Sequence, residues 1–141
     1  MRPVTPGATS AGGAVNEVLV TATSASDAMK KDTVKASTSV LLKRQPDCLI
    51  RKSSETSPVG DNVYNTDGRL QTKAQVAARG VKATYVVSVQ NDSNVALDLR
   101  VTGTGSSSGW SARYFDAATG GTEISSSVTG GGWWTPVLNP G

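Results

Sequence analysis

The sequence predicts an all-β protein of antiparallel strands, and three observations support that prediction. Hydrophobic residues recur at every second position in several short runs, which is the pattern of half-buried strands. Glycine is frequent, with 15 residues in a chain of 141, and together with serine and threonine it favours many short strands joined by turns. Helical turns are plausible only over residues 26–31 and 72–79, and both stretches are too short to carry a fold.

The first predicted strand pair is a hairpin near the N-terminus. Alternating small apolar residues run from Val18 to Ala22 and again from Val34 to Val40, with the polar loop 24–31 between them. Side chains two residues apart in a strand lie on the same face. We therefore expect one apolar face on this hairpin, and we assign to it a candidate interface of six residues: Val18, Val20, Ala22, Val34, Ala36 and Val40.

A second hairpin is predicted in the middle of the chain. Its strands are the alternating runs 85–90 and 95–102, and the turn-forming residues 91–94 lie between them. The second run is the clearest strand of the sequence, and we expect one face of it to line a core. The residues of that face are Val95, Leu97, Leu99 and Val101.

The aromatic residues of the C-terminal part have two possible roles. Trp110 and Tyr114 alternate with polar neighbours, so core packing is the expected role for both. Trp133 and Trp134 are adjacent, so a strand directs one indole inward and the other outward. The outward indole is a candidate interface residue or a platform for stacking on a sugar ring. The segment 52–71 is polar and predicts a surface connection with at most a short strand at 62–64.

Catalysis is not expected. The chain has no histidine and one cysteine, which removes the commonest general base and any internal disulfide. Cys48 lies in an apolar run without a neighbouring base, so we interpret it as a small buried hydrophobe. The 11 acidic residues form no recognisable pair, and the glycines of 103–109 precede no helix, so neither a catalytic site nor a cofactor site is predicted.

Composition and charge also limit the classes of partner that we expect. The net charge is +3, and the 14 lysines and arginines are scattered, so no nucleic-acid surface is predicted. Oxygen-bearing side chains gather in loops 61–67 and 91–94, but turn chemistry explains both, so no metal site is assigned and calcium binding stays open. The sequence shows no signal peptide and no run long enough to span a bilayer.

Several segments carry a resemblance to a known family. These are 85–95, Gly109-Trp110, 114–116, 128–133 and 138–141. Together they resemble the immunoglobulin-like repeats of large bacterial surface and secreted proteins, modules similar to those found beside carbohydrate-active enzymes. The resemblance covers residue 45 to the end, and Ser93 stands where the family usually has glycine. It implies an immunoglobulin-like antiparallel β-sandwich, an extracellular or cell-surface location and no catalysis.

The family pattern predicts that the chain is out of phase with its fold. In such repeats the last strands of the sandwich follow the Pro-Gly turn, which here is Pro140-Gly141, and a similar Pro-Val and Pro-Gly sequence occurs at 2–7. We therefore expect residues 1–44 to be the C-terminal strand hairpin of one repeat and 45–141 the N-terminal strands of the next. The linker 41–45 spans at most about 17 Å, which strains closure of the sandwich within one chain.

These expectations lead to two functional hypotheses. The first is a structural module that assembles head-to-tail into a fibre by strand complementation, with other copies of the chain or adjacent repeats as partners. The alternative is a carbohydrate-binding or adhesive accessory module, with polysaccharide as the partner and Trp133 and Trp134 as the contact residues. An interface is the first expectation for the two tryptophans.

Overall fold

The computed structural model describes residues 3–141. Met1 and Arg2, which begin the predicted segment 1–44, lie outside the described residues, and so does the start of the Pro-Val and Pro-Gly sequence at 2–7. All strand pairs are antiparallel, so the all-β prediction is confirmed. The elements in chain order are β1 (Val15–Thr23), β2 (Lys31–Ser39), β3 (Pro46–Lys52), β4 (Tyr85–Asn91), β5 (Arg100–Val101), α1 (Ser125–Thr129) and β6 (Trp133–Trp134).

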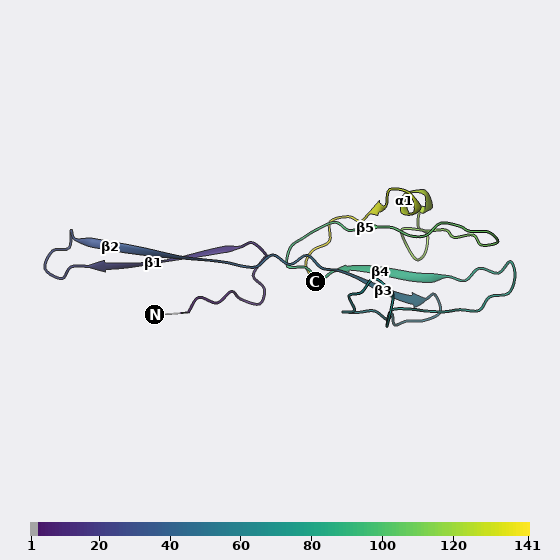
Figure 1. Cartoon of the computed structure of the whole chain (residues 1–141), viewed down its shortest axis with the longest axis horizontal. Coiled ribbons are helices and arrows are strands. Elements are labelled where there is room, and N and C mark those ends of the chain that lie inside the picture. The colour runs from purple at the N-terminus through teal and green to yellow at the C-terminus, as the bar shows by residue number, and fades with distance from the viewer. Residues whose placement is uncertain (1–2) are drawn as a thin grey trace.

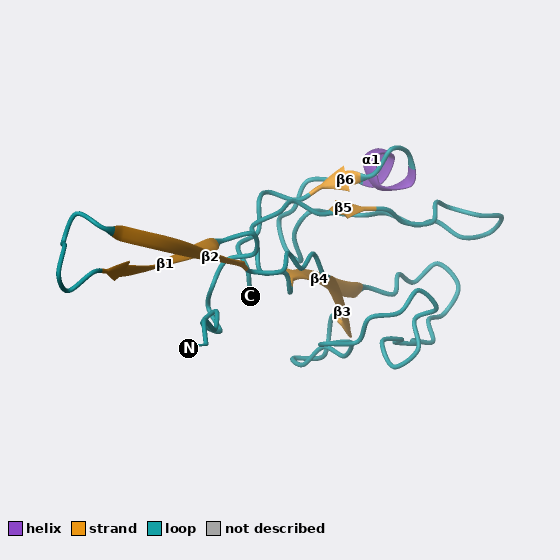
Figure 2. Ribbon diagram, turned by 60° about the vertical axis from the view of Figure 1, so that its left-hand side comes forward, coloured by secondary structure: helices purple, strands orange, loops and turns teal. Residues whose placement is uncertain are grey.

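The strands form three two-stranded sheets, β1–β2, β3–β4 and β5–β6. The first sheet projects from one end of the molecule as a long hairpin, and the other two belong to a wider part that we call the body, residues 46–141 (Figure 1). Long loops make up much of the body (Figure 2). The hairpin does not fold back over the body in either view.

The N-terminal hairpin forms where the alternation predicts it. Its register runs without a break from the pair Val15↔Ser39 to the pair Thr23↔Lys31. Loop 24–30 is closed by a hydrogen bond from the Ser24 amide to the Lys30 carbonyl, 3.0 Å. The hydroxyl groups of Thr21 and Thr33 lie 2.8 Å apart across the strands.

The predicted hairpin between runs 85–90 and 95–102 is wrong, because β4 pairs with β3. Residues 91–94 do not form its turn but run beside residues 43–45. The Asp92 amide donates to the Gln45 carbonyl (2.8 Å), and the Gln45 amide donates to Ser93 Oγ (2.7 Å). The Asn91 side chain reaches the carbonyls of Val95 and Leu138, each at 2.9 Å. These contacts fix the path of the chain between the β3–β4 sheet and the β5–β6 sheet.

The run that follows shows the predicted alternation but has a different partner. Leu97 bridges to Leu138, and the β5–β6 register pairs Val101 with Trp133. The four residues of the predicted core face are half-buried, and the residues between them are exposed. The face is therefore as expected, although the strand lies beside the C-terminal segment.

The predictions for three short segments have different outcomes. Neither 26–31 nor 72–79 is helical, so the helical turns considered there are absent. The segment 62–64 is not a strand, which agrees with the prediction of at most a short strand there. The one α-helix within residues 3–141, α1, has a sequence of serines and β-branched residues with low helix propensity. It is held by its buried Val128, whose carbonyl accepts a hydrogen bond from the Gly103 amide at 3.1 Å. Any side chain at position 103 would collide with Tyr114.

Candidate assembly interface

The apolar face of the hairpin is formed by residues that pair across β1 and β2. The register places Val18 opposite Ala36 and Val20 opposite Val34. Directly opposite residues of an antiparallel pair share a face, so these four side chains form one patch, which we call the donor face. Val20 and Val34 are 62% and 63% exposed. The donor face is therefore in solvent.

The other two predicted interface residues lie at the ends of this face. Ala22 is opposite Asp32, so the face ends there in a carboxylate. Val40 lies one residue beyond β2, and its amide donates to the Ala14 carbonyl at 2.8 Å. Val40 also lines a small hollow of about 100 Å³ at the base of the hairpin. The structure thus brings together four of the six residues and leaves Ala22 and Val40 at the margins.

The opposite face of the hairpin is more polar. Leu19 is opposite Lys35, and Glu17 forms an ion pair of 2.9 Å with Lys35 from a neighbouring position. Leu19 and Val15 share this face and are each 62% exposed, with Glu17 between them. The hairpin is therefore amphipathic, as a strand pair that packs on one side should be.

Both edges of the hairpin are also open. Among residues 3–141, β1 and β2 are hydrogen-bonded only to each other. A two-stranded hairpin without a packed face is marginally stable in water, and unpaired strand edges are templates for another strand. The arrangement therefore favours a partner that covers the apolar face, adds a strand, or does both.

The β3–β4 sheet carries a second apolar face. Its register places Cys48 opposite Val89 and Ile50 opposite Val87, and we call these four residues the acceptor face. Val87 is 58% exposed. A hollow of about 250 Å³ lies on this face, and it is lined by Cys48, Ile50 and Val87 together with the loop residues Asn65 and Gln71 among others.

The prediction of a buried Cys48 is wrong, because the side chain is exposed. The buried residues of this strand are Asp47 and Leu49, which occupy the other face. Asp47 Oδ2 accepts a hydrogen bond of 2.8 Å from the Asn62 amide, which holds the carboxylate inward. Partial burial of the thiol and the adjacent Asp47 carboxylate raise the pKa of Cys48. A raised thiol pKa disfavours the thiolate, so Cys48 is a poor nucleophile.

The tryptophans lie outside both hollows. Trp133 is half-buried opposite Val101, whereas Trp134 is 56% exposed opposite Arg100. Trp110 was expected in the core but is 79% exposed. It belongs to a tight turn in which its amide and carbonyl pair with those of Ser107, and its side chain stays in solvent.

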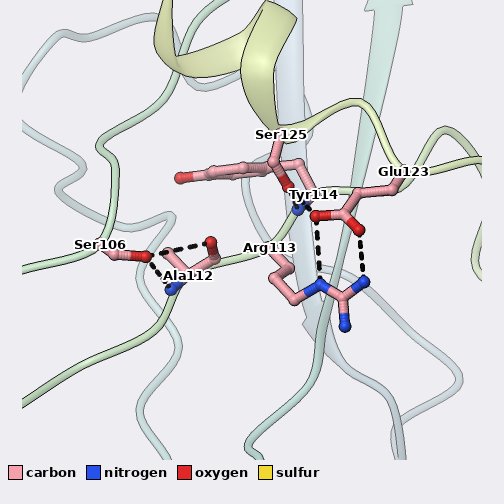
Figure 3. A network of polar contacts seen from close by, with 6 residues as sticks. All are labelled: Ser106, Ala112, Arg113, Tyr114, Glu123 and Ser125. Carbon is pink, nitrogen blue, oxygen red and sulfur yellow. Dashed lines mark hydrogen bonds and ion pairs between the residues drawn. The ribbon is translucent and has the colours of Figure 1, made fainter.

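A polar network unpredicted from sequence joins Arg113 and Tyr114 to Glu123 and Ser125 at the start of α1 (Figure 3). Arg113 forms an ion pair with Glu123, and its Nε lies 3.1 Å from Glu123 Oε1. Ser125 Oγ donates to Glu123 Oε1 and accepts from the Tyr114 amide, each at 2.9 Å. Arg113 lowers the pKa of Glu123 to about 2, with help from Ser125. Each charge is paired, so the network has a structural role.

The oxygen-bearing loops also use their side chains structurally. The Tyr64 hydroxyl donates to Asp92 Oδ2 at 2.5 Å, and this bond raises the pKa of Tyr64 to about 12. Asp67 Oδ1 accepts from the Arg69 amide at 3.1 Å within its own turn. Across residues 3–141, no group of three or more histidine, cysteine, aspartate or glutamate residues is placed to hold a metal ion.

Comparisons with known proteins do not assign the chain to a family. No protein-family model, curated protein or solved structure gives a significant match. Of the part of the chain that the structure describes, no helix is both long enough and apolar enough to cross a membrane.

Proposed function

We propose that the chain is a non-catalytic, extracellular structural module with an immunoglobulin-like β-sandwich fold, and that copies assemble head-to-tail into a fibre by strand complementation. The observation that carries this proposal is the hairpin β1–β2, whose apolar face and two edges are open to solvent. In the assembly, residues 1–44 of one copy serve as the last strands of a sandwich that residues 45–141 of the next copy begin.

The exposed area supports this assembly. The chain exposes 10853 Å², whereas a compact monomer of 14.5 kDa exposes about 6,900 Å². The excess is therefore about 4,000 Å². Each copy in a head-to-tail chain contributes one donor and one acceptor surface, so the area it loses equals that of one whole interface. Obligate interfaces bury about 2,000–5,000 Å², a range that contains the excess.

The proposed interface is heterologous, because the donor hairpin and the acceptor body are different parts of the chain. Interfaces of this kind generate rings when the rotation closes and open filaments when it does not. The hairpin extends along the long axis of the molecule, away from the body (Figure 1). An end-to-end arrangement of copies follows from that direction and favours a filament.

A carbohydrate-binding module is the alternative, and the exposed Trp134 and Trp110 are the residues that favour it. Sugar-binding aromatic residues usually line a concave site. Neither of the two hollows described above is lined by a tryptophan. The structural role is therefore the better-supported proposal.

Light scattering and electron microscopy of the pure chain test the proposal. We expect concentration-dependent growth of linear particles, and a stable monomer at micromolar concentration would overturn it. A glycan pull-down with Trp133→Ala and Trp134→Ala variants tests the alternative. A purely structural module retains no saccharide in any variant, whereas retention that either substitution abolishes would establish the carbohydrate function.

A further inference from the structure

We infer that the donor face of one copy packs on the acceptor face of a second copy, so that Val18, Val20, Val34 and Ala36 cover Cys48, Ile50, Val87 and Val89. This inference rests on the proposed function and names the surface that receives the hairpin. The packing is sheet against sheet, as in the two layers of a β-sandwich.

The two sides of the β3–β4 sheet differ in a way that selects one of them. The side that carries Asp47 and Leu49 is already covered by the chain itself, because both residues are buried. On the other side Cys48 and Val87 are exposed, Ile50 and Val89 are half-buried, and the hollow bordered by Asn65 and Gln71 leaves this apolar side open. Burial of apolar area drives association, so the exposed side is the one with free energy to gain from a partner.

The two faces also match in pattern. Each consists of two neighbouring cross-strand pairs of small or medium apolar side chains. The pairs on each face are separated by two residues along the strand, which is about 7 Å. Two-by-two patches of equal spacing allow the side chains of packed sheets to interdigitate at a separation of about 10 Å.

The charges that flank the two patches determine a single orientation. Beyond the Val20–Val34 pair, the donor face continues with Ala22 and Asp32. Beyond the Ile50–Val87 pair, the acceptor face continues with Lys52 and Tyr85. Asp32 and Lys52 form no ion pair in the described part of the chain.

When the two apolar patches are superimposed and the two charges are brought together, three contacts follow. Val20 and Val34 lie over Ile50 and Val87, and Asp32 lies beside Lys52. The remaining row then follows, with Ala36 near Cys48. In this orientation β2 of the donor copy runs antiparallel to β3 of the acceptor, and the reverse orientation leaves both charges without a partner.

Cys48 is the sole cysteine of the chain, which makes the assignment directly testable by cross-linking. A double variant, Ala36→Cys with Cys48→Ser, is mixed with wild-type chain and treated with a short bis-maleimide. We expect a cross-linked species that contains one chain of each kind. The matched control places the cysteine one residue earlier, as Lys35→Cys with Cys48→Ser, on the opposite face of the same strand. We expect at least a tenfold lower yield from it.

The outcomes separate the inference from the proposed function. Light scattering could show assembly while both variants cross-link equally, or while the Ala36→Cys variant does not cross-link. Either result would overturn the acceptor assignment and leave the fibre proposal intact. Absence of assembly would overturn both. A charge exchange gives a second readout: Asp32→Lys should weaken assembly at least threefold, and Lys52→Asp added to the same chain should restore it. Failure of the exchange to restore assembly would contradict the orientation.

Discussion

Val20→Ser and Leu19→Ser are a matched pair of substitutions that distinguishes the two faces of the hairpin. Both residues are 62% exposed, and they are adjacent in β1, so they point to opposite sides. Neither substitution should disturb the isolated chain much, because both side chains are already largely in water. A difference between the two variants therefore reports on what covers each face.

The size of the effect follows from the exposed fractions. Complete burial of a valine is worth about 1.5–3 kcal/mol, so covering the exposed part of Val20 contributes about 1–2 kcal/mol. Val34 is 63% exposed and contributes a similar amount. Because 1.4 kcal/mol is a tenfold change in affinity, Val20→Ser should raise the concentration needed for assembly roughly 5- to 25-fold. The double variant Val20→Ser/Val34→Ser should raise it roughly 30- to 700-fold.

The assay is sedimentation velocity or static light scattering over a concentration series, with circular dichroism to verify that strand content is unchanged. For Leu19→Ser we expect a shift of less than about threefold, because its face stays in solvent in the proposed assembly. The reasoning would be refuted if Leu19→Ser weakened assembly as much as Val20→Ser. It would equally be refuted if neither variant changed assembly.

The remaining predictions concern the body. Asp47→Ala should lower the free energy of unfolding by about 1 kcal/mol, because the Asn62 amide loses its acceptor while the unpartnered Asp47 Oδ1 is removed as well. Asp47→Asn should cost less, and equal urea midpoints for the alanine variant and wild type would contradict this. The folded pKa of Glu123 is lowered from 4.5 to about 2 by Arg113, so its stabilising contribution is complete above pH 4.5 and is lost as the pH falls toward 2. Urea unfolding of Glu123→Gln should therefore differ most from wild type above pH 4.5, and a difference that grew as the pH fell would have the wrong sign.

Features encoded by contiguous residues were predictable. The β1–β2 hairpin follows from alternation in two runs joined by a short polar loop, because all its pairing partners lie within 25 residues. The half-buried face that contains Leu97 and Leu99 was likewise visible from alternation alone. The donor face could thus be read from sequence almost completely.

Features that depend on contacts between residues far apart in the chain were not predictable. β4 pairs with β3, and the side chains of Asn91 and Ser93 bind distant backbone groups instead of closing a turn. No local pattern indicates either outcome. Cys48 and Asp47 alternate, so one had to face inward, and the Asn62 amide 15 residues away made it the carboxylate. The acceptor face could not be identified before that side was known.

The sequence by itself determined that this protein is all-β, that its N-terminal hairpin is amphipathic, and that it contains no histidine. Period-two patterning and composition are local properties, so they can be recognised without knowledge of the fold. Only the tertiary structure decided which strands pair, which side of β3 is exposed, and where Trp110 lies. Those choices depend on hydrogen bonds and packing between residues far apart in the chain, whose energies no single segment contains.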